Sequence, residues 1–400
     1  MNAKDTSPQP LRLLIALQYY LPHRTGYSLY VQRVAEGLVA LGHQVTVLTA
    51  RHRIDLPRDE VINGVRIVRL WAPIRVSRGM VAPAYPWSMW GLLRQHDAVW
   101  LHLPMLETAL TAVLARLTGR GLVATHHGDL VLPAGAFNRF IEWFVFRLYA
   151  YMARYAHRVI GYSHDYANHS YYLKPFRDKV SIIYPPIQIP DPEPERVAEL
   201  RARWQHEDGP IIGYAGRFVA EKRPDLLIRS LEKINERYPN ARIVFAGEYD
   251  IQYEDTWEKN QPLVQRFNEQ LIFLGLISSA QAMANFYAAC DVLVLPSDTE
   301  CFALVQVEAM LCGTPVVMTD TPGGRVPVRE TGMGKIVPRG DWQAIGQAVI
   351  DVLQTPEDYH RSAEEIGQIF SFDQTVQRYE KHFRAAAVAS RHWRGPHGSR

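Results

Sequence analysis

The chain has 400 residues, of which 47% are hydrophobic and 21% are charged, and its formal net charge is +3. These proportions exclude wholesale disorder, and the length predicts two domains. The mild charge does not suggest a protein that binds nucleic acid, which usually needs a concentrated basic stripe. The spacing of Cys290, Cys301 and Cys312 favours neither a disulfide framework nor a zinc site.

The N-terminus gives no sign of a targeting segment. Its first ten residues are polar, and the apolar run that follows is too short for a secretory signal. No apolar run reaches the length of a membrane-spanning helix. We therefore expect a cytoplasmic protein, with any association with the inner face of the membrane being peripheral.

Short apolar runs alternate with longer amphipathic stretches, as in a parallel α/β sheet. In the first half of the chain a helix is expected at 31–41, and strands are expected at residues 11–17, 45–49, 98–101, 122–125 and 159–162. The proline-rich, acidic residues 184–195 predict a linker. The rhythm then restarts with a helix at 224–237 and strands at residues 211–215, 241–246, 271–274, 292–295 and 314–318.

Two doubly wound domains follow from this order, over residues 1–187 and 188–370. Residues 371–390 predict a long amphipathic helix, expected to cross back to the first domain, and the tail after it is expected to be disordered. Ligands of open α/β sheets bind outside the carboxyl ends of the strands, so we expect the site between the two domains.

Two loops of the first domain carry candidate residues. Gly26 lies after the first strand, where close approach of the backbone to a ligand favours glycine. This turn lacks GxGxxG, which argues against a dinucleotide dehydrogenase.

His126 and His127 follow the strand at 122–125, and because adjacent side chains point to opposite sides, only one should face the site. The alternative is a buried structural histidine. Asp129 either orients a histidine or caps the next segment.

Residues 137–160 predict a basic amphipathic helix with Arg147, Arg154 and Arg158 on one face. Such a helix can lie in a membrane interface, but a core helix with its arginines in solvent is the favoured interpretation. A second aromatic-rich stretch could line an acceptor groove, contact a membrane or simply pack; it contains Trp71, Met80, Tyr85, Trp87, Met89 and Trp90.

In the second domain, Glu300 and Glu308 flank the start of a helix expected at 302–311. A helix start offers unpaired amides to a diphosphate, here those of Phe302, Ala303 and Leu304. Glu308 is placed to bind a ribose diol, and Glu300 to reach a sugar ring. Alone, this pair would more simply be two solvent-facing acids.

Arg217 and Lys222 follow the strand at 211–215 and could clamp a pyrophosphate, Arg as a fork and Lys as a point charge. Glu248 ends another strand at the same edge and could border the nucleotide base. Because two cations can neutralise a leaving diphosphate, we expect no metal ion and no cofactor.

The segment ECFALVQVEAMLCGTPVV resembles the signature of glycosyltransferase family 4, and GYAGRFVAEKRPDLLI resembles that family's diphosphate-binding motif. The resemblance covers almost the whole chain. It implies a GT-B fold, an α/β architecture of two Rossmann-like domains facing across a cleft. Cys301 and Ala303 stand where glycines are commonest in the family.

The resemblance also implies an activity. It is the retaining transfer of a sugar, commonly a hexose, from a UDP- or GDP-sugar to a hydroxyl of a glycan or lipid-linked acceptor. In that family the residue matching Glu300 contacts the donor sugar and the residue matching Glu308 the ribose. The T-x-H pattern implies that His127 contacts the reacting sugar, so His127 and Glu300 are the catalytic candidates. Alternatives are a GT-B phosphorylase, a sugar-nucleotide epimerase, or a sugar-nucleotide-binding protein without turnover.

Overall fold

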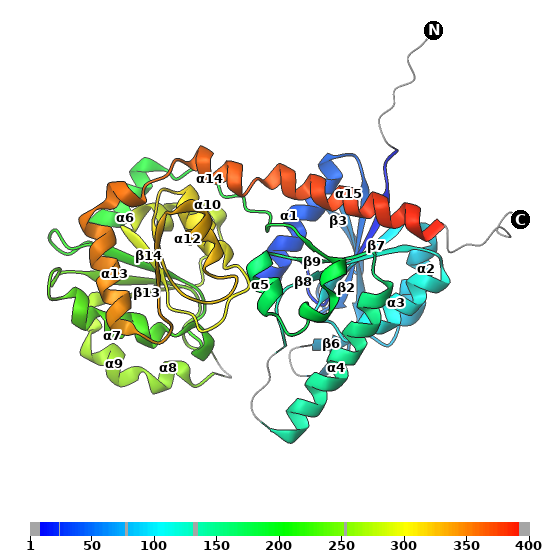
Figure 1. The fold of residues 1–400 in the computed structure, drawn as a ribbon, viewed down its shortest axis with the longest axis horizontal. Coiled ribbons are helices and arrows are strands. Elements are labelled where there is room, and N and C mark those ends of the chain that lie inside the picture. The colour runs from blue at the N-terminus through cyan, green and yellow to red at the C-terminus, as the bar shows by residue number, and fades with distance from the viewer. Residues whose placement is uncertain (1–8, 24, 77–78, 131–134, 252–253, 392–400) are drawn as a thin grey trace, which may run out of the picture. The chain divides into compact units, whose positions relative to one another are not determined.

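The computed structural model describes residues 9–23, 25–76, 79–130, 135–251 and 254–391. Two compact units make up the chain: residues 1–186 together with 373–400, and residues 187–372. Each unit is described by itself below. Both contain a parallel sheet covered by helices (Figure 1).

The sheet of the first unit has the strand order β10-β9-β8-β7-β1-β2-β4-β3. Its strands are β1 Arg12–Ala16, β2 Gln44–Arg51, β3 Asp59–Ile62, β4 Val65–Trp71, β7 Ala98–Leu103, β8 Gly121–His126, β9 Arg158–Gly161 and β10 Val180–Ile182. All neighbours pair in parallel except β3 and β4. The residues of β7 and β8 are buried throughout, as expected for parallel strands covered on both faces.

The chain reverses its direction of travel across this sheet between β1 and β7. From β1 it passes to β2 and β4, then returns to β7 and continues outward to β10. Such a switch point is where doubly wound sheets leave a crevice at the carboxyl ends of the strands. A small antiparallel hairpin, β5 Ile74–Val76 and β6 Gly79–Val81, follows β4 in the chain.

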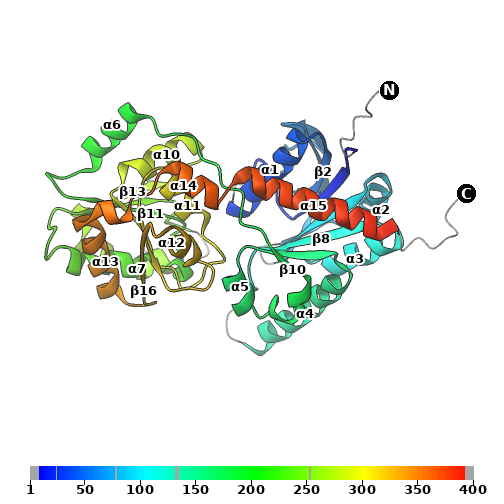
Figure 2. The ribbon, with the colours of Figure 1, turned by 45° about the horizontal axis from the view of Figure 1, so that its top comes forward.

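Helices connect the strands of the first unit. They are α1 Gly26–Ala40, α2 Tyr85–Gln95, α3 Thr108–Leu117, α4 Ala136–Tyr155, α5 His164–His169, η1 Lys174–Lys179 and α15 Phe372–Arg391. Thr25 caps α1 through a reciprocal pair of hydrogen bonds with Ser28, a capping box. Helix α15 packs against this unit (Figure 2). The Tyr379 hydroxyl hydrogen-bonds Thr125 and Tyr30.

The second unit has an all-parallel sheet with the order β13-β12-β11-β14-β15-β16. Its strands are β11 Ile211–Ala215, β12 Arg242–Ala246, β13 Leu271–Gly275, β14 Val292–Leu295, β15 Val316–Thr319 and β16 Gly334–Val337. The switch point lies between β11 and β14. Helix α7 buries an apolar stripe that includes Leu227, Leu231 and Ile234 in the core.

The helical segments of the second unit alternate with its strands. They are α6 Pro194–Trp204, η2 Ala220–Lys222, α7 Pro224–Ile234, α8 Thr256–Lys259, α9 Gln261–Arg266, η3 Asn268–Gln270, α10 Ala280–Ala289, α11 Leu304–Leu311, α12 Val326–Thr331, α13 Trp342–Gln354, η4 Pro356–Tyr359 and α14 Ala363–Ile369.

The structure corrects the predicted basic helix. The basic helix expected over 137–160 is α4, which ends at Tyr155, and Arg158 belongs to β9. Ala156 and His157 separate the two elements, so the three arginines do not share one helical face. The predicted disordered tail after residue 391 lies outside the described residues. None of the described helices combines the length and apolar composition needed to cross a membrane.

Candidate functional site

The second unit brings Lys222 and Glu300 into direct contact. Lys222 ends the short turn η2 after β11, and Glu300 lies in the loop after β14. Their side chains form an ion pair, 25% and 12% exposed respectively, and Ser297 Oγ also donates to Glu300 Oε1 at 3.1 Å. β11 and β14 are neighbours at the switch point, so their loops emerge side by side. Both residues were predicted as site residues from the sequence, but the contact between them was not.

A main-chain hydrogen bond and side-chain ion pairs hold the two loops together. The Asp298 amide donates to the Glu221 carbonyl at 2.9 Å, and Arg223 forms ion pairs with Asp225 and Asp298. Arg223 itself has the left-handed φ of 49°. The loop that carries Lys222 is therefore braced against the loop that carries Glu300 before any ligand arrives.

Arg217, also predicted to bind diphosphate, is more exposed. Its guanidinium lies 3.7 Å from the Glu221 carboxylate, and both side chains are about half exposed. An exposed pair of this kind contributes little to stability, so Arg217 can exchange its partner at low cost. Glu248 also has an exposed side chain, while its carbonyl accepts a hydrogen bond from the Phe218 amide.

Helix α11 begins at Leu304, two residues later than predicted. Ala303 caps it in the left-handed conformation, with φ 57° and ψ 80°, and no side chain caps its first turn. The side chain of Phe302 is buried, with its ring 5.6 Å from that of Phe370. Glu308 lies in the second turn of α11 and accepts a hydrogen bond from the Tyr287 hydroxyl at 3.2 Å.

The loop after β15 completes this region and was not predicted from the sequence. Glu300 forms an isolated β-bridge with Gly323, where an added Cβ would lie 2.4 Å from the Cys301 carbonyl oxygen. An added Cβ on Gly324 would approach Glu300 Cβ at 2.9 Å. The Gly-Gly pair in TPGG was the available signal, because adjacent glycines often mark a close approach of backbone.

In the first unit, the two adjacent histidines have different surroundings. His126 is buried and hydrogen-bonds Asp129 at 2.9 Å, and Asp129 also accepts from Ser170 at 2.6 Å. Asp129 therefore orients His126 and fixes the segment after β9. His126 is the structural member of the pair.

His127 lies in a cage of aromatic rings. Its Nε2 is 2.8 Å from His102 Nδ1, its Nδ1 hydrogen-bonds the Tyr162 hydroxyl, and its ring makes edge contacts with Tyr27 and Tyr30. Burial lowers the pKa of His127 well below its ordinary value, so the ring is neutral near pH 7. A sugar that contacts this ring through nitrogen has to displace one of these two partners.

Gly26 is the first residue of α1, and Thr25 before it is the cap. Thr25 thus has a structural role, because its hydroxyl accepts a hydrogen bond from the Ser28 amide at 3.2 Å. Gly26 belongs to the first unit, whereas the other predicted donor-binding residues belong to the second.

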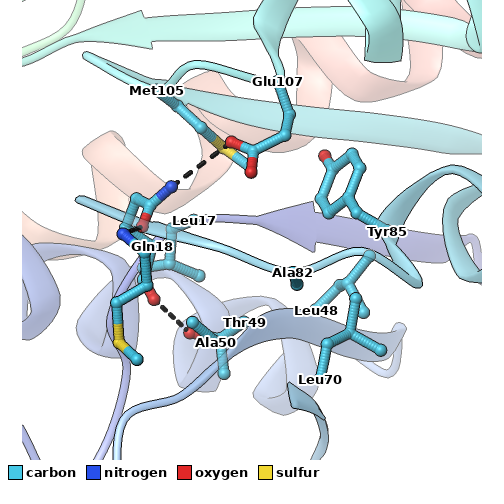
Figure 3. Close-up of a pocket in the computed structure, with 11 residues that line it drawn as sticks. Leu17, Gln18, Leu48, Thr49, Ala50, Leu70, Ala82, Tyr85, Met105 and Glu107 are labelled. Atoms are coloured by element: carbon cyan, nitrogen blue, oxygen red, sulfur yellow. Dashed lines mark hydrogen bonds between the residues drawn. The ribbon is translucent and has the colours of Figure 1, made fainter. Parts of the chain in front are cut away.

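A pocket opens at the carboxyl ends of β1, β2 and β7 in the first unit (Figure 3). It is a small cavity of about 10 Å³, and its walls are mostly apolar. Two polar side chains, Gln18 and Glu107, point toward each other in it, with Gln18 Nε2 donating to Glu107 Oε2 at 3.3 Å. The Met80 amide in turn donates to Gln18 Oε1 at 2.8 Å.

Burial raises the pKa of Glu107 above its ordinary value. Gln18 and Glu107 were not predicted from the sequence, since each is an isolated polar residue in a loop. Of the aromatic-rich stretch, Met80 and Tyr85 line this pocket, and Met89 is buried in the core. Trp71 and Trp87 are exposed instead.

Within the described residues, no group of three or more histidine, cysteine, aspartate or glutamate side chains is arranged to hold a metal ion.

Comparisons with known proteins cover both units. The family profile of the glycosyl transferases group 1 matches residues 197–368, and that of the glycosyl transferase 4-like domain matches residues 25–186. A protein of Methanocaldococcus jannaschii, described as an uncharacterized glycosyltransferase, is 28% identical over 317 residues, covering 74% of this chain and 77% of that protein.

A second relative has a described activity. The GDP-mannose-dependent alpha-(1-6)-phosphatidylinositol monomannoside mannosyltransferase of Mycolicibacterium smegmatis is 26% identical over 366 residues, covering 86% of this chain and 90% of the relative. Among solved structures, HepE of Anabaena in complex with UDP-glucose has a TM-score of 0.74 at 17% identity, covering 94% of this chain and all of that one. The likeness to HepE shows the fold. The chain belongs to the glycosyl transferases of group 1, the family 4 type, and has the GT-B fold.

Proposed function

We propose that the protein transfers a hexose from a nucleoside-diphosphate sugar to a hydroxyl acceptor, with retention at the anomeric carbon and without a metal ion or cofactor. The observation that carries the proposal is the Lys222–Glu300 contact at the carboxyl edge of the second sheet. It joins a cation suited to a diphosphate with a carboxylate suited to sugar hydroxyls. The uncapped start of α11 supplies amides for the same anion.

The proposed roles follow from these positions. Lys222 and Arg217 would neutralise the diphosphate, and the amides at Ala303 and Leu304 would hold its oxygens. Glu300 would bind hydroxyls of the transferred sugar once the diphosphate draws Lys222 away from it. Glu308 would hold the ribose. The mannosyltransferase relative uses GDP-mannose, and HepE binds UDP-glucose, so these two donors are the first to test.

Thermal unfolding in the presence of GDP-mannose, UDP-glucose, GDP and UDP tests donor binding. A ligand that binds only the folded state at 100 times its Kd adds about 2.7 kcal/mol of stability. We expect Lys222→Met to lose most of this shift. Lys233→Met is the matched control, because Lys233, near the end of α7, forms an ion pair with the exposed Glu236 just beyond that helix. Absence of any shift in the wild type would contradict the proposal.

Product analysis then separates transfer from the alternatives. With GDP-mannose and an acceptor such as phosphatidylinositol in vesicles, we expect a glycosylated product whose anomeric configuration, read by NMR, matches the donor. An epimerase would convert the donor without an acceptor, and a phosphorylase would require phosphate. Glu300→Gln should retain nucleotide binding and lower the transfer rate by about 100-fold, on the scale of other lost transition-state contacts. Activity unchanged by excess EDTA would support metal independence.

The carboxyl-end face of the first sheet around Gln18 and Glu107 is the proposed acceptor site. The cavity between these residues is about 10 Å³, the space of roughly one water molecule, so an acceptor would bind at its rim. Gln18 is held by the Met80 amide, so its amide is oriented in advance. The hydroxyl-binding group here would be the Glu107 carboxyl, which in its protonated form can both donate and accept a hydrogen bond.

Helix α4 is the proposed site of membrane contact. Phe140, Trp143 and Phe144 are 59%, 53% and 49% exposed, and with Arg147 they follow the i, i+3, i+4, i+7 spacing of one helical face. The Arg147 guanidinium lies over the Trp143 ring at 5.2 Å. Figure 2 shows α4 beside α3 along the first unit. An exposed stripe of aromatic and basic side chains suits an anionic lipid surface.

Co-sedimentation with vesicles tests this contact. We expect the wild type to bind vesicles that contain phosphatidylserine more tightly than pure phosphatidylcholine vesicles. The triple variant Phe140→Ser, Trp143→Ser, Phe144→Ser should lose at least tenfold in affinity, since each exposed aromatic side chain contributes buried apolar area. Leu276→Ser, at a 66% exposed site in the second unit, is the control. Equal binding by all three proteins would exclude α4 as the contact.

A further inference from the structure

Three neighbouring strands of the first sheet end in a chain of hydrogen-bonded side chains. His102 comes from the end of β7, His127 directly follows β8, and Tyr162 directly follows β9. His102 Nδ1 lies 2.8 Å from His127 Nε2, and the Tyr162 hydroxyl hydrogen-bonds His127 Nδ1. Both nitrogens of the His127 ring are therefore engaged within the protein.

Neutral groups surround the two rings. The centroid of the His102 ring lies 4.2 Å from that of Trp100 and 5.8 Å from that of Tyr27. The His127 ring contacts the rings of Tyr27, Tyr30 and Tyr162. The titratable groups that face the pair are thus Tyr27 and Tyr30 from α1 and Tyr162 after β9, with His126 next along the chain. Burial lowers the pKa of His102 and of His127 well below the ordinary value, and each histidine is neutral at pH 7.

Counting protons limits what this pair can do. Two ring nitrogens at hydrogen-bond distance need one proton between them, because two protons or none would leave the rings repelling each other. The far nitrogen of His102, Nε2, is buried and has no hydrogen-bond partner among the described residues. A proton that reached this nitrogen could go no further, so the pair is suited to holding a ring in place rather than to conducting protons.

We propose that His102 is a positioning residue that holds His127 as a neutral ring in one orientation and one tautomer. The proposal rests on the proposed function only for its effect on sugar transfer. His127 would then meet the reacting sugar as a fixed dipole, and not as a general acid or base. The Trp100 ring packs between the rings of His102 and Tyr379, so the C-terminal helix α15 supports the same arrangement.

NMR of the ¹⁵N-labelled histidine side chains in the free enzyme tests the pair without any substrate. We expect His127 to show a single neutral tautomer from pH 8 down to pH 5.5. His102→Leu should produce a mixture of both tautomers, because Nε2 loses its partner. His102→Asn, whose side-chain oxygen can take the place of Nδ1, should restore a single tautomer. Titration of wild-type His127 near pH 6.5, or two tautomers in the wild type, would overturn the proposal.

Kinetics with GDP-mannose tests the consequence for transfer. We expect His102→Leu to lower kcat about tenfold with an unchanged KM for the donor, the size of effect expected from one lost hydrogen bond. His102→Asn should recover most of the rate. His96→Leu removes a buried histidine that directly follows α2 and lies outside the pair, and it is the control for general destabilisation. A His102→Leu rate equal to that of His96→Leu would refute the role. If the wild type transfers no sugar, the proposed function fails, and the NMR result still decides the pair.

Discussion

At the scale of residues, the structure assigns each candidate a set of partners. Lys222 and Glu300, far apart in the chain, neutralise each other, and a donor has to compete with this ion pair. His127 is enclosed by aromatic rings, with both ring nitrogens bonded. Sequence patterns identify such residues but do not show which groups of the protein already form hydrogen bonds or ion pairs with them.

Glu107 predicts a dependence of stability on pH. Its folded-state pKa is raised by burial above the ordinary value, so it holds its proton more tightly in the folded state. The stability that protonated Glu107 contributes is therefore fully present below the ordinary pKa of the unfolded state. It is lost as pH rises through the raised pKa of the folded state. A tenfold difference in proton affinity between the folded and unfolded states corresponds to about 1.4 kcal/mol of stability.

Glu107→Gln imitates the protonated carboxyl and should remove this dependence. We expect the variant to be more stable than the wild type at pH 7 and equally stable at pH 4, as measured by urea unfolding at both values. Glu195→Gln, on the exposed first turn of α6, is the control. Equal unfolding free energies of Glu107→Gln and wild type at pH 7 would show that Glu107 carries no burial penalty.

At the scale of elements, the start of α11 stores strain. Ala303 has a φ of 57°, a region that costs a residue with a Cβ roughly 1–2 kcal/mol. Glycine, commonest in the family at this position, would avoid the cost.

Ala303→Gly should therefore raise stability by up to about 1 kcal/mol, after allowing for the greater freedom of glycine in the unfolded chain. Ala303→Val should lower stability, because a β-branched residue fits this conformation poorly. Ala282→Gly within α10 should lower stability by about 0.5–1 kcal/mol and calibrates the cost of a helical glycine. Denaturant unfolding measures all three. A loss of stability in Ala303→Gly would contradict the assigned strain.

At the scale of the whole molecule, the C-terminal helix α15 is part of the first unit although it follows the second in sequence. Tyr379 hydrogen-bonds Tyr30 and Thr125, and His43 contacts Glu380 at 3.2 Å. Gly121 at the start of β8 allows the close approach, since an added Cβ there would lie 2.4 Å from the Ala386 carbonyl carbon.

Gly121→Ala should accordingly displace α15 and destabilise the first unit by about 1–3 kcal/mol, as overpacking does. Gly91→Ala in α2 is the matched control, because an added Cβ there meets no atom within 4 Å and alanine favours a helix. Thermal unfolding compares the two variants, and limited proteolysis followed by mass spectrometry shows whether α15 is released first. Equal stability of both would exclude this tight packing.

Much of the secondary structure could be predicted from local pattern. The strands at 211–215 and 292–295 match β11 and β14 in full, because continuous apolar runs bounded by turn residues identify buried parallel strands. Strands β3, β4, β5, β6, β10 and β16 were missed. Their partly exposed or short runs lack this signal, as the alternating burial along β3 and β4 illustrates. Helix α4 was extended too far because neither glycine nor proline directly follows its end at Tyr155.

Linear motifs were enough to predict the GT-B family and its fold. They also identified Glu300, Glu308 and Lys222 as candidates, because the spacing of motif residues can be read from the sequence without knowledge of any contact. Three further features required the folded chain: the Lys222–Glu300 ion pair, the Gln18–Glu107 pocket and the His102–His127 pair. Each joins residues on different strands or their loops. Strand order, which depends on contacts between distant segments, decides which loops become neighbours, and no local pattern encodes it.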